Sequence, residues 1–393
     1  MGKFDFDKII DRQGTGAIKV DLLAERFGRA DVLPFWVADM DFLSPPAVID
    51  ALVERAKHGV FGYTAAPQSF FDSIIHWLDS YHGWKVEQEW LTFVPGVVKG
   101  ISFVVDCFLE AGDKVVIQPP VYYPFRSVPA MRGYEVVDNP LILNNDRLEI
   151  DFEDLKNKID EKCKLLILCN PHNPGGRVWT REELQQIADI CHEKGVLVVS
   201  DEIHSDLAFD RHTHTPFASV SEKAAMNSIT FMAPSKTFNI AGIISSFSVI
   251  PNARLREEFN KYLELSELST GHIFAYTATE AAYHCGREWL EEAKQYIWHN
   301  ICHTKEYIEK NIPQIKVMIP EASYLIWLDC RDLGLSQDDL VSFFVNDAHL
   351  ALNSGTTFGT GGEGFMRLNV GCPRSVLQQG LKNLKAAVEQ KQL

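Results

Sequence analysis

The sequence predicts an α/β protein, with a mostly parallel central sheet in a large domain and a smaller α+β domain. Short apolar runs such as Val196–Ser200 and Ile229–Met232 alternate with helical segments. This alternation is typical of a parallel sheet covered by helices on both faces. After Pro251 the pattern changes to long helices interrupted by short strands. The 393 residues also exceed the size at which single cores stop growing, about 250–300 residues.

The individual elements have recognisable ends. The chain to about residue 43 reads as irregular. Ser44-Pro45-Pro46 opens a helix that Gly59 ends, because serine can cap a helix and proline suits its first turn. Thr180-Arg181-Glu182-Glu183 is a capping box for a helix that extends to Lys194. Further helices are expected at 67–82, 96–109, 252–268, 273–284, 286–311, 336–346 and from 374, and strands at 114–118, 135–138, 165–169, 196–200, 229–232, 243–250, 314–318, 323–329, 349–352 and 365–370.

These elements predict a division of the chain into two domains. Residues 59–285 form the large domain, and residues 286–393 form the small C-terminal domain. The N-terminal segment 1–58 contributes to the small domain, which is therefore expected to be discontinuous.

Composition narrows the classes of function. The chain has 53 acidic against 38 basic residues, a formal charge of −15. This balance disfavours nucleic acids and anionic membrane surfaces as partners. No run reaches the ~18 apolar residues that a membrane span needs, and the first residues lack an apolar leader, so a soluble, cytoplasmic protein is expected. The eight cysteines form no CxxC pair, which favours free thiols over disulfides or a metal site.

Polar residues follow three of the predicted strands directly. They are Asn173 in Asn170–Gly176, the strand-terminal Asp201, and Lys236 in a run of small and apolar residues. Each alone has an ordinary explanation: a turn, a helix cap and a surface lysine. The carboxyl ends of parallel strands, however, share one edge of a sheet, where ligands bind. The three together therefore predict a ligand site.

With these residues the sequence resembles the fold-type I pyridoxal-phosphate (PLP) enzymes of the aspartate-aminotransferase-like superfamily. It is most similar to the MalY/PatB-type cystathionine β-lyases. The resemblance covers nearly the whole chain and implies the type I PLP-dependent transferase fold, pyridoxal 5′-phosphate as cofactor, and a homodimer with shared active sites. It rests on Trp36–Phe42, Phe61–Thr64, Asp201–Leu207, Ser235–Asn239 and Arg367–Arg374.

The resemblance also implies roles for residues around the cofactor ring. Lys236 forms the Schiff base and serves as the proton-transfer base, as suits an amine whose pKa is lowered by desolvation. Asp201 pairs with the pyridine nitrogen and makes the ring an electron sink. Asn173 donates to the ring phenolic oxygen. Tyr122 stacks on the ring, although its neighbour Tyr123 is an alternative.

Further implied roles concern the phosphate and the substrate. The free N–H groups of Gly96, Val97 and Val98, at the start of a helix, hold the phosphate together with Ser235. Tyr63 reaches the phosphate from the other subunit. The substrate-binding residues are Arg367, which clamps the carboxylate in bidentate fashion, Trp36 and Asp39.

Two positions depart from the aminotransferase pattern. His204 stands three places after Asp201, where those enzymes usually carry tyrosine, and is expected among the cofactor-binding residues. Ile244 stands eight places after Lys236, where they usually carry a phosphate-binding arginine. Both departures occur in the lyase-like subfamily and therefore favour it. They leave more of the phosphate binding to Ser235 and to backbone donors.

The leading hypothesis is carbon–sulfur β-lyase activity on an L-cysteine thioether such as cystathionine, yielding pyruvate, ammonia and a thiol. An aminotransferase acting on small amino acids is the alternative, and a partner-binding regulatory protein is a non-enzymatic one. No metal site is expected, because His299 and His303 have no third ligand nearby in sequence. His212 and His214 are expected at the surface. The glycine-rich run Gly359–Gly364 is expected to form a flexible loop.

Overall fold

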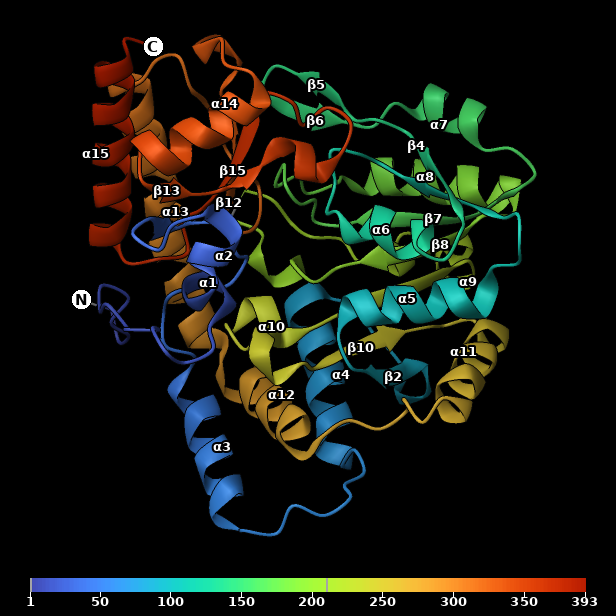
Figure 1. Cartoon of the computed structure of the whole chain (residues 1–393). Helices are drawn as coiled ribbons and strands as arrows, with labels where there is room; N and C mark the ends of the chain where they lie inside the picture. The colour runs from blue at the N-terminus through green and yellow to red at the C-terminus, as the bar shows by residue number, and fades with distance from the viewer. Residues whose placement is uncertain (1, 210) are drawn as a thin grey trace.

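The computed structural model describes residues 2–209 and 211–393, and Figure 1 shows their arrangement. At its centre lies a seven-stranded sheet of order β2-β10-β9-β8-β7-β3-β4. Neighbouring strands from β9 through β4 are parallel, whereas β10 is antiparallel to both of its neighbours. The predicted mostly parallel sheet in an α/β fold is therefore confirmed. The strands are β2 (Leu91–Val94), β10 (Ser246–Val249), β9 (Ser228–Met232), β8 (Leu197–Asp201), β7 (Cys163–Cys169), β3 (Lys114–Ile117) and β4 (Glu135–Asp138).

Helices cover both faces of this sheet, as the alternating burial of β7 shows. Leu165 and Ile167 belong to the apolar cluster formed with α5 (Val97–Phe108) and α11 (Ala253–Leu265). Leu166 and Leu168 belong to the cluster formed with α7 (Phe152–Lys158) and α8 (Arg181–Lys194). Successive side chains of a strand point to opposite faces, so a strand buried on both sides is apolar throughout. The predicted capping box is present at the start of α8.

The remaining helices of the sheet-bearing part pack against the helices that cover the sheet or lie at the ends of its strands. In Figure 1, α4 and α12 lie beneath the sheet, α3 packs against α12, and the loop after α3 projects below them. These helices are α3 (Pro46–Lys57), α4 (Gln68–His82), α6 (Pro124–Ala130), α9 (Glu222–Met226), α10 (Pro234–Thr237) and α12 (Ile273–Cys285).

The C-terminal part carries a second, four-stranded antiparallel sheet of order β11-β12-β15-β14. It is flanked by α13 (Arg287–Asn311), α14 (Gln337–Ser342) and α15 (Arg374–Lys391). Within the N-terminal segment, β1 (Leu33–Pro34) pairs with β13 (Leu350–Ala351). That pairing ties the segment to the C-terminal part, while the domain boundaries themselves stay a prediction. The strands of this sheet are β11 (Lys316–Met318), β12 (Leu325–Asp329), β15 (Phe365–Asn369) and β14 (Asn353–Ser354).

Three local expectations were wrong. The N-terminal segment is not wholly irregular, because it contains the short helices α1 (Ile18–Asp21) and α2 (Leu23–Phe27). Ser44 does not cap α3; its hydroxyl donates to the Asn239 carbonyl, 2.9 Å away. The strand expected from residue 243 begins only at Ser246, because Ile244 has a left-handed φ of 54° that interrupts an extended chain.

Shorter elements escaped the sequence analysis. Strand β2 and the hairpin of β5 (Ile142–Asn144) and β6 (Arg147–Glu149) have only three or four residues per strand. Such runs are too short for a periodic pattern to stand out. Among the described residues, no helix is long and apolar enough to cross a membrane.

Candidate active site

A cavity of about 300 Å³ opens at the carboxyl ends of the central strands. Asn173 lies just after β7, Asp201 ends β8, and Lys236 lies in α10 just after β9. These three strands are neighbours in the sheet, so their carboxyl ends deliver the three side chains to one place. The predicted residues that line the cavity are Gly96, Val97, Val98, Tyr122, Asn173, Asp201, His204, Ser235 and Lys236.

Lys236 is half-buried and lines this cavity. Its Nζ donates to the Ala38 carbonyl at 2.6 Å. Burial lowers the pKa of Lys236 to about 8, against the opposing charges of Asp39 and Asp201. Because the uncharged amine is the nucleophilic and basic form, this environment makes Lys236 chemically competent near neutral pH.

Asp201 is the buried carboxylate of the site. The side chain is 4% exposed and accepts a hydrogen bond from the Ile203 N–H at 3.1 Å. Burial raises the pKa of Asp201 to about 7, and neighbouring Glu202 adds to the rise, while Lys236 and the Ile203 N–H oppose it. A buried carboxylate with so little compensation is poised to bind a cationic group.

His204 and Tyr122 form other walls of the cavity. Burial, with the charges of Lys236 and Arg367, lowers the pKa of His204 to about 3, so its imidazole is neutral. Its Nδ1 is buried without a hydrogen-bond partner in the described structure. Tyr122 lines the cavity, and burial raises its pKa. Tyr123 instead has half its surface exposed and lines a separate hollow.

Arg367, on β15, lies behind Asn173. Its Nη1 donates to Asn173 Oδ1 at 3.1 Å, and its Nη2 donates to Asn353 Oδ1 at 2.7 Å and to the Trp36 carbonyl at 2.6 Å. The guanidinium stacks over the Phe358 ring at 5.0 Å. Its Nε is buried without a partner in the described structure, and burial lowers the pKa of Arg367 to about 10. The Nε–H group of Arg367 is therefore free to donate to a bound ligand.

The opening of α5 supplies backbone donors. Gly96 precedes the helix with a φ of 108°, a conformation that favours glycine. The first N–H groups of a helix have no partner within it, so those of Val97 and Val98 can receive an anion. The Gly96 N–H is already held by Ser246 Oγ at 3.0 Å.

Sequence reasoning missed Ser245 and Ser246, which line the cavity beside these donors. The one signal in the sequence was their position directly after Ile244, with Ser245 just before β10 and Ser246 at its start. It also missed the Ala38 carbonyl, because a backbone acceptor leaves no mark on residue type. Lys99 lies at the rim and is another cation of the cavity wall.

Four predicted residues do not line the cavity. Arg367 contacts Asn173, which does line it. Tyr63 is fully exposed in the loop after α3. Trp36 contributes its carbonyl to Arg367, while its Nε1 donates to the Lys19 carbonyl at 3.0 Å. The Asp39 carboxylate pairs with Arg12 and Lys19.

The expectation of a surface histidine is wrong for His214. This side chain is buried, and its Nε2 lies 2.8 Å from Glu202 Oε2. Glu202 is itself fully buried next to Asp201 and also accepts from Ser200 and the Phe217 N–H. Because a buried carboxylate requires partners, the loop folds inward to supply one.

The fold and the residues around the cavity define a class of protein, and comparison with known protein families identifies that class. The family model described as aminotransferase class I and II matches residues 30–384. The chain belongs to this family.

Within the family the chain is similar to carbon–sulfur lyases. It is 48% identical to the cystathionine β-lyase PatB of Bacillus subtilis, over 98% of this chain and 100% of that protein. The structure of cystalysin from Treponema denticola, which contains pyridoxal 5′-phosphate, matches with a TM-score of 0.96 and 35% identity over 99% of both chains. The PLP-bound C–S lyase of Staphylococcus hominis matches with a TM-score of 0.90 and 34% identity over 98% of both chains. The resemblance found in the sequence is thus confirmed.

Proposed function

We propose that this chain is a PLP-dependent carbon–sulfur β-lyase that converts an L-cysteine thioether, such as cystathionine, to pyruvate, ammonia and a thiol. The observation that carries the proposal is that half-buried Lys236 and buried Asp201 line one cavity, in a chain 48% identical to a cystathionine β-lyase. A nucleophilic amine and a buried carboxylate that can pair with a cation, lining one cavity, suit such chemistry.

The residues around the cavity fit pyridoxal 5′-phosphate. Asp201 can pair with the ring nitrogen, and the partnerless Nδ1 of His204 offers a further polar contact. The α5 N-terminus and Ser235 can hold the phosphate, with Tyr122 against the ring. When bound, the cofactor supplies the electron sink that makes a Cα–H bond acidic.

The protein side chains then orient the substrate and move its protons. The partnerless Nε of Arg367 and the rest of its guanidinium can bind the substrate carboxylate. Lys236, with its lowered pKa, takes up the Cα proton. Neutral His204 adds no cation to the cavity, so it does not oppose the positive charge that Asp201 stabilises.

The titration of Lys236 gives a prediction that does not depend on turnover. In cofactor-free protein, competitive acetylation followed by peptide mass spectrometry is expected to show half-maximal reactivity of Lys236 near pH 8. Burial disfavours the ammonium form and lowers the pKa of Lys236 from 10.5 to about 8, so the reactive amine is present at a lower pH than in an ordinary lysine. A midpoint near 10.5 would contradict the environment described here.

The choice between lyase and aminotransferase is tested by products. With cystathionine and no added 2-oxo acid, we expect pyruvate and ammonia to form stoichiometrically with thiol. A thiolate is a good leaving group because the pKa of its conjugate acid is near ~8.5. Glutamate has no such leaving group and should undergo only slow exchange with a 2-oxo acid. Exchange faster than cystathionine cleavage, on one preparation, would assign the chain to the aminotransferases instead.

We further propose that the protein is a homodimer in which Tyr63 completes the partner's site. The loop carrying Tyr63 also exposes Val60 and Phe61, 63% and 59% exposed, and α3 exposes Val53. Clustered exposed apolar side chains are typical of an interaction surface.

The expected mass in sedimentation is about twice 44.4 kDa. Tyr63→Phe is expected to weaken cofactor binding, measured by spectroscopic titration, without dissociating the dimer, because only the hydroxyl is lost. An active monomer would refute the shared site.

A further inference from the structure

The segment Trp36–Phe42 lies between the two key cations of the site. The Trp36 carbonyl accepts from Arg367 Nη2 at 2.6 Å, and two residues further on the Ala38 carbonyl accepts from Lys236 Nζ, also at 2.6 Å. One short stretch of backbone therefore contacts both the arginine assigned to the substrate carboxylate and the lysine assigned to proton transfer.

Neutral side chains hold this segment from two sides. Asn239, three residues after Lys236, bonds to the N–H and C=O of Met40 and to the Phe42 carbonyl, at 2.8–3.0 Å. Asn369, two residues after Arg367, donates to the Val37 and Asp39 carbonyls at 2.6 and 2.7 Å. The segment thus bridges the part of the chain that carries Lys236 and the part that carries Arg367.

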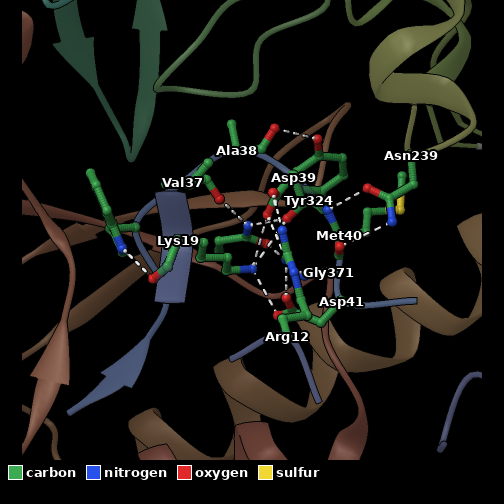
Figure 2. A network of polar contacts seen from close by, with 12 residues as sticks. Arg12, Lys19, Val37, Ala38, Asp39, Met40, Asp41, Asn239, Tyr324 and Gly371 are labelled. Atoms are coloured by element: carbon green, nitrogen blue, oxygen red, sulfur yellow. Dashed lines mark hydrogen bonds and ion pairs between the residues drawn. The ribbon is translucent and has the colours of Figure 1, made fainter. Parts of the chain in front are cut away.

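A cluster of four charges adds the strongest contacts, as Figure 2 shows. Arg12 binds Asp39 and Asp41 at 2.7 Å each. Lys19 Nζ lies 2.7 Å from Asp41 and 3.4 Å from Asp39, and also donates to the Asp39 carbonyl at 3.2 Å. The four charges balance, and Lys19 is only 1% exposed.

The basic residues of the cluster stabilise the ionised form of Asp39. Burial pushes the pKa of Asp39 upward, but Arg12 and Lys19 outweigh it and hold that pKa below its ordinary value. Removing one charged residue would leave its partner unpaired with little access to solvent. Loss of a single ion pair therefore destabilises the fold. The cluster consequently holds the backbone between Asp39 and Asp41, in the same segment whose carbonyls contact Lys236 and Arg367.

We propose that the cluster of Arg12, Lys19, Asp39 and Asp41 is a positioning element that sets the Trp36–Phe42 backbone as a common support for Lys236 and Arg367. This inference rests on the proposed function of the site and deepens it. The cluster residues act through the backbone: Trp36 O and Ala38 O fix the two cations relative to each other. Such relative placement matters because the Cα–H bond is oriented by its carboxylate and attacked by the lysine.

The test compares four proteins with cofactor bound. They are the wild type, Lys19→Met, Lys19→Met/Asp41→Asn, and the control Leu184→Ala. The double variant keeps the remaining charges balanced, so it is expected to fold even if the single variant leaves too costly a charge. Leu184 is fully buried in α8, in an apolar cluster that does not include the segment, so its truncation destabilises the fold without touching the cluster.

Three measurements are made on each protein. They are kcat and KM for cystathionine per bound cofactor, the Kd of alanine from the cofactor absorption, and amide hydrogen exchange of residues 36–42. Because small misplacements can cost about 100-fold in kcat/KM, both Lys19 variants should raise KM and lower kcat by about tenfold each. They should also weaken alanine binding and speed exchange of the segment. Leu184→Ala should leave KM, alanine binding and this exchange unchanged.

Unchanged KM, alanine Kd and exchange in the double variant would overturn the positioning role. A role in stability alone would make the Lys19 variants behave like Leu184→Ala, with less folded protein but normal constants per site, and this result also overturns the proposal. Failure of the proposed function is distinguishable: if the wild type does not cleave cystathionine, alanine binding and exchange still decide the role of the cluster.

Discussion

Replacing Lys236 by alanine is expected to abolish the borohydride-reducible link to pyridoxal phosphate and to lower thioether cleavage by at least ~10⁴-fold, the upper range for removing a positioned acid–base group. The reason lies in the burial of Lys236, which lowers its pKa to about 8 and places its amine in the cavity with Asp201. Peptide mapping after borohydride treatment, together with a pyruvate assay, measures both effects.

The cavity offers a matched control for this experiment. Lys99 also lines it, and Lys99→Ala is expected to keep the covalent link at Lys236. If the Lys236→Ala protein still carries a reducible cofactor link, or if the link maps to Lys99, the assignment of Lys236 is wrong.

The second large effect concerns Arg367. Arg367→Ala is expected to reduce kcat/KM for cystathionine by about 30- to 4,000-fold, which corresponds to about 2–5 kcal/mol for the loss of a buried charged hydrogen-bond partner. The variant loses the carboxylate donor and leaves Asn173 and Asn353 without the bonds they now make to its guanidinium. Steady-state kinetics on the cofactor-loaded protein measures the loss.

Two further variants test whether the loss is specific to the guanidinium of Arg367. Arg367→Lys keeps a cation but loses the planar fork, so its kcat/KM should lie between those of the wild type and Arg367→Ala. Arg254, exposed on α11, is the control, and Arg254→Ala should change kcat/KM by less than about twofold, as is usual at surface positions. Wild-type kcat/KM in Arg367→Ala would exclude Arg367 from substrate binding.

Much of the central sheet was predictable because its signals are local. Strands β7, β8 and β9 are short, mostly apolar runs with a polar residue at or soon after the end, and the capping box that opens α8 lies within four residues. Parallel strands place their carboxyl ends at one edge, so the meeting of Asn173, Asp201 and Lys236 followed from order along the chain.

Other features depended on contacts between distant residues. His214 sits in a loop, yet it is buried because Glu202 needs a partner. The start of β10 is delayed by the left-handed Ile244, which packing and not residue preference imposes. Ser245 and Ser246 reach the cavity only because β10 pairs with β2 beside the opening of α5.

The sequence by itself therefore determined the α/β class, the strands that carry the central site residues, and the types of side chain that the site uses. Only the tertiary structure decided that Trp36–Phe42 contacts both Lys236 and Arg367, and that Arg12 and Lys19 form ion pairs with Asp39 and Asp41 of that segment. These contacts connect residues about 20 to 330 positions apart. Backbone carbonyls and balanced charges of this kind leave no periodic pattern in a sequence, because any residue carries the carbonyl and the partners are chosen by packing.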